Sequence, residues 1–166
     1  MDKGIQVDSV YTDFRKAFDK VDHYILLKKI AFNGIRGDLL RWFHSYITKR
    51  TQRVVVNGHS SNLVTVISGV PQGSILGPLL FILFINDINN CFHHSHFLLY
   101  ADDLKVYLPI LSADDNFKLQ SDLYRLSLYC TKNKLQLNVD KCKSITFTKK
   151  RNLINNTYTI NNTEWI

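Results

Sequence analysis

Length, composition and charge narrow the classes to which this chain can belong. Its 166 residues, 45% hydrophobic and 12% aromatic, are enough for one domain with a packed core, and they exclude a mainly disordered chain. The net charge of +7, from 21 Lys and Arg against 14 Asp and Glu, attracts phosphates and favours a nucleic-acid partner.

The first elements are predicted to be a strand and a helix. Ser9–Thr12 is a short β-prone run that ends at Asp13. Asp22 can cap an amphipathic helix over Ile25–Phe32, and Gly34 stops it. A strand that ends in a carboxylate therefore leads into a helix.

A second helix and a hairpin follow. Asp38 can cap a helix that carries the apolar residues of 39–47. The Asn57-Gly58 pair is a strong turn signal, and it lies between the β-prone runs Gln52–Val56 and Leu63–Ile67.

The middle of the chain alternates between loop, helix and hairpin. Gly69–Ser74 is too rich in glycine and proline to be regular, and it leads into an apolar helix over about Leu79–Ile88. Two apolar runs, Phe97–Tyr100 and Leu104–Leu108, are joined by Ala101–Asp103. This pattern predicts a hairpin with carboxylates at its tip.

The last elements complete an α+β pattern. Ser112 and Asp115 form a capping-box-like start to a helix that reaches about Tyr129. Ser144–Thr148 and Tyr158–Ile160 have the composition of short strands. Helices that alternate with hairpins predict an α+β sandwich with a mainly antiparallel sheet.

The adjacent acids Asp102 and Asp103 are the most distinctive polar feature. Like charges at a hairpin tip repel each other, and a bound cation would relieve that repulsion. An isolated Asp-Asp pair is more often an ordinary polar turn, and Asp114-Asp115 is explained as helix capping. Asp13 also ends a strand, so three hard oxygen ligands could hold Mg²⁺ if the two strands are neighbours.

Three segments resemble the successive signature motifs of reverse transcriptases of the non-LTR (LINE-like) retrotransposon type. They are Tyr11–Val21, Gly69–Phe81 and Tyr100–Asp103. Their order matches that family, and so does the interval of 89 residues (102 − 13) between Asp13 and Asp102. The resemblance runs from about Val7 to Phe147.

The resemblance implies roles for residues around the first motif. Asp13 and Asp102 would be the principal Mg²⁺ ligands and Asp103 would complete the triad, with Mn²⁺ as an alternative ion. The backbone carbonyl of Phe14 would add a ligand. Phe18 would lie beneath the incoming sugar and select deoxynucleotides, although a plain core phenylalanine explains it equally well without the motif.

The later motifs imply further contacts. Gln72 would contact the incoming nucleotide or the template, and Gly69 and Gly73 would let the backbone approach the substrate. A loop glutamine that touches only water is the alternative for Gln72. Lys141 resembles a lysine that protonates the pyrophosphate leaving group. Asp19 is expected to be structural. The basic residues around Lys141 would form either a phosphate track or a solvated face.

Cysteine and histidine residues give no comparable signal. Cys91, Cys130 and Cys142 are scattered and favour neither a disulfide framework nor a zinc knuckle. The cluster from Cys91 to His96 fits no standard zinc spacing, so a solvated loop is the interpretation.

The longest apolar run, Leu79–Ile85, is far below the roughly 18 residues of a membrane helix, and no signal peptide is evident. We expect an intracellular protein without a membrane partner.

The resemblance implies a polymerase palm, an antiparallel sheet packed on helices, over residues 1–150. Fingers and thumb are expected to be largely missing, and residues 151–166 to be a polar tail or the start of the primer-grip region. The implied activity is that of an RNA-directed DNA polymerase acting on an RNA template, a DNA primer and deoxynucleotide triphosphates. The alternative is a truncated, catalytically silent relic that at most binds nucleic acid, and we expect the chain alone to be inactive.

Overall fold

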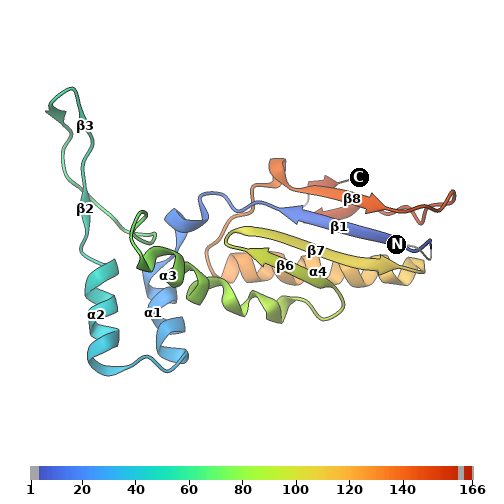
Figure 1. Ribbon diagram of the computed structural model, residues 1–166, viewed down its shortest axis with the longest axis horizontal. Coiled ribbons are helices and arrows are strands. Elements are labelled where there is room, and N and C mark those ends of the chain that lie inside the picture. The colour runs from blue at the N-terminus through green and yellow to red at the C-terminus, as the bar shows by residue number, and fades with distance from the viewer. Residues whose placement is uncertain (1–3, 161–162, 166) are drawn as a thin grey trace. The chain divides into compact units, whose positions relative to one another are not determined.

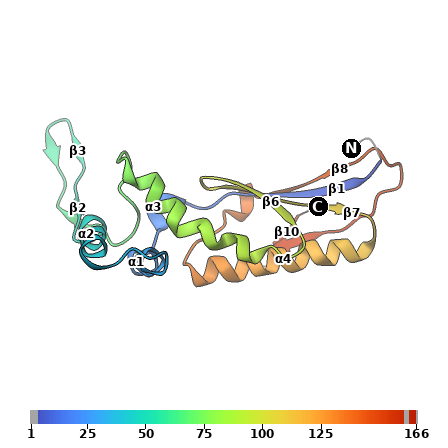
Figure 2. The same cartoon turned by 60° about the horizontal axis from the view of Figure 1, so that its bottom comes forward.

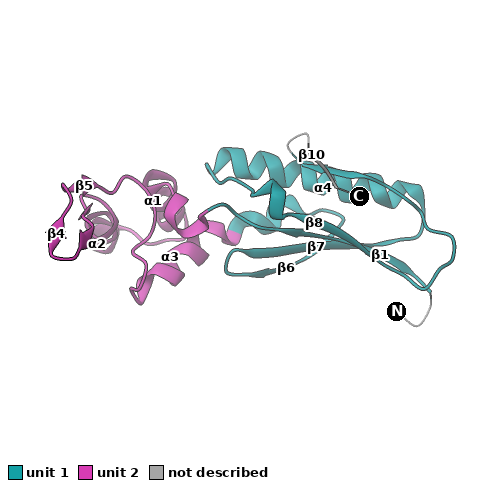
Figure 3. Ribbon diagram, turned by 90° about the horizontal axis from the view of Figure 1, so that it is seen from above, with its two compact units in different colours: residues 1–15, 87–166 teal, residues 16–86 magenta. Residues whose placement is uncertain are grey.

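The chain divides into two compact units (Figure 3). The computed structural model describes residues 4–160 and 163–165. Unit 1 combines residues 1–15 with residues 87–166, and unit 2 is residues 16–86. Asp13 and the Asp102-Asp103 pair, far apart in sequence, therefore belong to the same unit. Among the described residues, no helix has both the length and the apolar character that crossing a membrane requires.

Unit 1 is built on a four-stranded antiparallel sheet in the order β6-β7-β1-β8 (Figure 1). The strands are β1 (Gln6–Thr12), β6 (His96–Tyr100), β7 (Asp103–Ile110) and β8 (Lys143–Phe147). β1 pairs with both β7 and β8, so the strand that leads to Asp13 lies inside the sheet. The predicted α+β fold with an antiparallel sheet is confirmed.

One face of this sheet is covered by α4 (Ala113–Lys132), as Figure 2 shows. Every second side chain of β7 is buried, beginning at Leu104 and ending at Ile110. On α4 the buried residues include Leu119, Leu123 and Leu126, spaced three or four apart. The buried side chains of β7, which repeat every two residues, pack with the buried side chains of α4, which repeat about every 3.6 residues, in one apolar layer. The predicted capping residue Asp115 accepts the backbone N–H of Ser112 at 3.0 Å.

The end of the chain also belongs to unit 1. After η3 (Val139–Lys141) and β8, β9 (Tyr158–Ile160) pairs with β10 (Thr163–Trp165). Tyr158 is 1% exposed, and its hydroxyl donates to Asp8 Oδ2 at 2.6 Å. Asp8 Oδ1 accepts from Thr146 at 2.8 Å. This buried network holds Tyr158 against the core. The domain boundary near residue 150 stays a prediction.

Unit 2 contains three α-helices in its described residues. They are α1 (His23–Phe32), α2 (Gly37–Ile47) and α3 (Leu76–Ile85), with η1 (Ala17–Lys20) before them and η2 (Asn86–Cys91) leading into unit 1. Asp22 caps α1 as predicted, accepting the backbone N–H of Ile25 at 3.0 Å. The predicted cap Asp38 is wrong, because α2 has Arg36 at its N-cap and Asp38 in its first turn. Acids suit both positions, since both face the positive end of the helix dipole.

The predicted hairpin of unit 2 is formed by four very short strands. Asn57 and Gly58 both have positive φ, 49° and 80°, as a two-residue primed turn requires. β3 (Val55–Val56) pairs with β4 (His59–Ser60) around this turn, and β2 (Thr51–Gln52) pairs with β5 (Val64–Thr65). The apolar helix α3 begins three residues earlier than predicted, at Leu76.

Candidate active site

Strand register places Asp13 beside the hairpin that carries the paired acids. In the β1–β7 ladder Thr12 lies opposite Leu104. Asp13 directly follows Thr12, and Asp103 directly precedes Leu104, so the two acids come next at the same end of the ladder. The hairpin of β6 and β7 closes between Tyr100 and Asp103 with only two residues in its loop. Two carboxylates that are 90 positions apart (103 − 13) therefore meet at one end of the sheet.

The hairpin turn is tight and conformationally special. Ala101 has φ 51°, which is the left-handed region that two-residue hairpin loops use. Its partner in the loop is Asp102, which is half-buried, whereas Asp103 is exposed. The turn therefore presents two adjacent carboxylates on a backbone that has little freedom to move.

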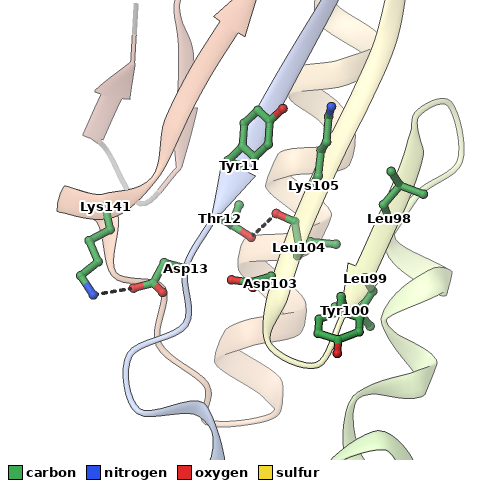
Figure 4. Close-up of a pocket in the computed structure, with 10 residues that line it drawn as sticks. All are labelled: Tyr11, Thr12, Asp13, Leu98, Leu99, Tyr100, Asp103, Leu104, Lys105 and Lys141. Carbon is green, nitrogen blue, oxygen red and sulfur yellow. Dashed lines mark hydrogen bonds and ion pairs between the residues drawn. The ribbon is translucent and has the colours of Figure 1, made fainter.

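A pocket of about 740 Å³ lies where these elements meet (Figure 4). Asp13 and Asp103 line it from opposite sides in the close-up. Asp102 belongs to the described residues but is not among those that line this pocket. The structure thus brings Asp13 and Asp103 into one cavity, with Asp102 in the turn beside them.

Asp13 is held by the segment before β8. Its carboxylate Oδ2 accepts from the Asn138 side chain at 3.2 Å, and its backbone carbonyl accepts from the Asn138 N–H at 2.7 Å. Lys141 Nζ lies 3.6 Å from the same Oδ2, and the Lys141 side chain is 69% exposed. Lys141 therefore reaches the pocket as an exposed cation tethered next to Asp13 (Figure 4).

The donor atoms of the site fit a hard divalent cation. Carboxylate oxygens are the ligands that Mg²⁺ takes from proteins, and Asp13 and Asp103 offer them to the same pocket. Among the described residues, no three His, Cys, Asp or Glu side chains are already gathered closely enough to hold a metal ion. The assignment of Asp13, Asp102 and Asp103 as metal ligands stays a prediction.

Sequence reasoning missed two residues near the carboxylates of the pocket. Asn138 lies three residues before Lys141, and only the fold shows that it holds Asp13. Lys105 lines the pocket, and its Nζ lies 4.9 Å from the centre of the Tyr11 ring and 5.4 Å from that of Phe147. The signal for Lys105 was present, because a residue two positions after Asp103 on a strand shares its face.

The substrate-binding candidates of the middle motif lie in unit 2, on a loop docked to η1. Gln72 donates from Nε2 to Asp19 Oδ1 at 2.6 Å, and Val70 N–H donates to the Phe18 carbonyl at 2.9 Å. Asp19 therefore holds Gln72, which agrees with a structural role for Asp19. Gly73 is exposed with φ 77°.

The backbone of this loop passes so close to η1 at Gly69 that no side chain fits there. A Cβ added to Gly69 would lie 2.9 Å from both the Cα and the carbonyl oxygen of Asp19. The Gly69 carbonyl accepts from Arg50 Nη2 at 3.1 Å, and it lies 2.8 Å from His23 Nε2. A residue with a side chain would push the loop away, so glycine is required by contact as well as by its φ of 87°.

The aromatic candidates are packed against the protein. Phe14 is 3% exposed and forms an isolated bridge with Leu137. Phe18 is half-buried, and its ring stacks on Phe81 with centroids 4.3 Å apart. The nucleotide contacts of Phe14 and Phe18 stay predictions.

Comparison with known proteins identifies the chain by sequence. The model of the reverse transcriptase (RNA-dependent DNA polymerase) family matches residues 9–160. The chain is 32% identical over 158 residues to the RNA-directed DNA polymerase of the mobile element jockey from Drosophila funebris, covering 89% of this chain and 17% of that protein. It is 28% identical over 155 residues to the Pol polyprotein of the retrotransposable element R2 from Popillia japonica, covering 86% and 25%. The chain spans a quarter or less of these relatives.

A solved structure agrees on the fold. The telomerase from Candida albicans, in complex with a fragment of telomeric RNA, superposes with a TM-score of 0.67 at 13% identity, over 95% of this chain and 29% of that one. At that identity the likeness concerns the fold alone. The family match over residues 9–160 and the retrotransposon relatives show that the chain belongs to the reverse transcriptase family, in the form carried by non-LTR retrotransposons.

Proposed function

We propose that this chain carries the catalytic centre for RNA-templated DNA synthesis. In that reaction a primer 3′-hydroxyl attacks the α-phosphorus of a deoxynucleotide triphosphate and releases pyrophosphate. The observation that carries the proposal is the β1–β7 register, which sets Asp13 beside the Asp102-Asp103 hairpin. Carboxylates from distant parts of the sequence meet at one pocket on neighbouring strands.

Asp13, Asp102 and Asp103 are the residues that would hold Mg²⁺, with Mn²⁺ as an alternative. When bound, the ions would activate the primer hydroxyl and offset charge on the leaving oxygen. The protein's own contribution is orientation. Asn138 fixes the Asp13 carboxylate, and the two-residue turn limits where Asp102 and Asp103 can point.

Lys141 would supply a proton to the pyrophosphate leaving group. Its exposed ammonium lines the pocket and lies 3.6 Å from Asp13 Oδ2. An ammonium tethered near the carboxylates and still open to solvent can reach a leaving oxygen and be reprotonated afterwards. The exposed Lys141 side chain supports this role.

The loop of unit 2 would contact the nucleotide or the template. Gln72 is exposed, although its amide is oriented by Asp19. Phe18 keeps a partly exposed ring on the rigid support of Phe81. A ring held in this way could exclude a 2′-hydroxyl by steric contact, which would favour deoxynucleotides.

Nucleic acid is the partner that the charge favours, and the template would be RNA. Residues 16–86 carry nine Lys and Arg against three Asp, and 9 − 3 gives +6 of the chain's total of +7. A compact unit with that excess charge attracts phosphates by counterion release. The telomerase with a similar fold is itself bound to an RNA fragment, which is consistent with an RNA partner here.

A chimera tests the activity. Residues 1–166 replace the aligned segment of the jockey polymerase, and primer extension is measured on an RNA template with Mg²⁺. We expect extension by the chimera, a loss of about 1,000-fold or more with Asp102→Asn, and no loss with Asp114→Asn. Filter binding is measured in parallel. Full extension by the Asp102→Asn variant would refute the catalytic assignment, and binding without any extension would favour the silent relic.

A further inference from the structure

Asp122 is a buried carboxylate outside the proposed catalytic pocket. It lies on α4, and its side chain is 0% exposed. It accepts three successive backbone N–H groups, from His93 at 3.2 Å, His94 at 2.9 Å and Ser95 at 2.8 Å. Arg125 Nη1 donates to it at 2.6 Å. Every one of these donors favours the ionised form.

The charge of Asp122 is stabilised by this surrounding. Burial alone would raise the pKa of the Asp122 carboxyl, but the N–H groups of His94, Ser95 and His93 outweigh it, and the pKa lies below its ordinary value. A turn of three consecutive N–H groups is a concave site for an anion, and here a side chain from another element fills it. The Cys91–His96 segment is thus bound through its backbone amides.

The bound turn stands directly before a strand of the catalytic hairpin. It joins η2 to β6, and β6 leads to Tyr100 and the carboxylate turn. β6 is the edge strand of the sheet, and among the described strands it pairs only with β7. An edge strand takes its register from its single partner strand and from the turn that joins the two, and a slip of one residue would turn all its side chains to the other face.

A second contact ties the same segment to the same helix. Tyr129 lies seven residues after Asp122 on α4 and donates from its hydroxyl to Asp87 Oδ1 at 2.7 Å. Residues seven apart share a helix face. One face of α4 therefore holds both ends of residues 87–95, the segment through which the chain reaches the hairpin.

We propose that Asp122 is a positioning residue for the catalytic hairpin, holding the start of β6 so that Asp102 and Asp103 stay in register with Asp13. The role is indirect, because β6 separates the residues that Asp122 binds from the carboxylate turn. It deepens the proposed function and rests on it for its catalytic consequence. The claim that Asp122 holds the residues before β6 rests only on the hydrogen bonds of Asp122 and does not depend on the proposed function.

Asp122→Asn tests this with little change in shape. The Asn side-chain amide keeps one oxygen that can accept a hydrogen bond, but its NH₂ group faces a backbone N–H that needs an acceptor. The turn at residues 93–95 also loses the negative charge of Asp122. We expect faster amide hydrogen exchange across residues 93–100 of the chain. We also expect weaker Mn²⁺ binding by electron paramagnetic resonance, and about a 10- to 100-fold lower kcat in the jockey chimera with unchanged primer-template Kd. Asp114→Asn, an exposed acid of the same helix, should change none of these readouts.

The outcomes separate positioning from mere stability. Faster exchange confined to residues 93–95, with Mn²⁺ affinity and kcat at the level of the parent chain, would overturn the proposal. If Asp122→Asn fails to fold, Arg125→Gln removes one bond from a partly exposed side chain and should shift the same readouts by about threefold. Unchanged readouts in Arg125→Gln would then count against Asp122. A chimera without activity would refute the proposed function, while exchange and Mn²⁺ binding would still decide the role of Asp122.

Discussion

Asp13 depends on a short segment that is remote in sequence and adjacent in space. Asn138 and Lys141 both reach its carboxylate, the first as a hydrogen-bond donor and the second as a cation. An amide restricts the orientation of a carboxylate without neutralising it. The exposed Lys141 ammonium can move away from the Asp13 carboxylate and return to it. Asn138 therefore suits an orienting role, and Lys141 suits a role in proton transfer.

Lys141→Met should separate proton transfer from binding. We expect about a 100-fold fall in the kcat of primer extension by the jockey chimera, with unchanged primer-template Kd. Lys132→Met, at an exposed lysine in the last turn of α4, is the control. Loss of binding together with rate in Lys141→Met would show that Lys141 only attracts nucleic acid.

Asp115 gives a prediction on stability and pH. The hydrogen bond from Lys118 and the N–H groups of Leu111 and Ser112 lower the pKa of the Asp115 carboxyl to about 2, from 3.8. A lowered pKa stabilises the fold above the unfolded value, and this contribution is lost as the pH falls toward 2. Asp115→Asn should cost about 1 kcal/mol at pH 7. In urea unfolding the difference from the parent chain should shrink between pH 4 and pH 2. A difference that stays constant over that range would contradict the capping role.

At the scale of elements, the docked loop of unit 2 leaves no room for a side chain at Gly69. Gly69→Ala brings a methyl group to 2.9 Å from the Asp19 backbone, whereas an added Cβ at Gly73 would meet nothing within 4 Å. Both positions have positive φ, so both variants carry the cost of a left-handed alanine, about 1 kcal/mol. Gly69→Ala should cost about 2 kcal/mol more, measured by chemical unfolding. Equal costs at the two positions would mean that the close approach does not matter.

Elements fixed by local chemistry were predictable from the sequence. The Asn57-Gly58 turn, the Asp22 cap and the alternation along β7 each follow from a few neighbouring residues. The resemblance added the pairing of Asp13 with the hairpin, which local patterns only suggested. The cap of α2 was misplaced because Asp is a strong N-cap residue and Arg is not, so the local pattern favoured Asp38, whereas α2 begins at Gly37 and carries Asp38 in its first turn.

Other features depend on contacts between distant residues. Asp122 reads as an ordinary polar residue of a helix, and only the fold shows three backbone amides around it. Asp8 is a buried acid on a strand, and its partner Tyr158 lies 150 positions away. A buried carboxylate gives no pattern in sequence, because what satisfies it is brought there by packing.

At the scale of the whole molecule, the excess charge is concentrated in one unit. Residues 16–86 hold +6, which leaves +1 for the rest of the chain. Unit 1 carries the carboxylates of the proposed catalytic centre, and its acids nearly balance its bases. If the proposed function holds, the chemistry lies in unit 1, and most of the attraction of nucleic acid lies in unit 2.

Salt dependence of RNA binding tests this division. The logarithm of Kd for a single-stranded RNA should rise with the logarithm of salt concentration, by about 0.7 for each phosphate contact. Replacing Lys28, Lys49 and Arg53 of unit 2 by Gln should lower this slope by about 2. Replacing Lys132, Lys143 and Lys150 of unit 1 should lower it by less than about 1. All six side chains are exposed, so neither set should disturb the core. A larger effect from the unit 1 set would place the RNA on the sheet and the basic end of the chain instead.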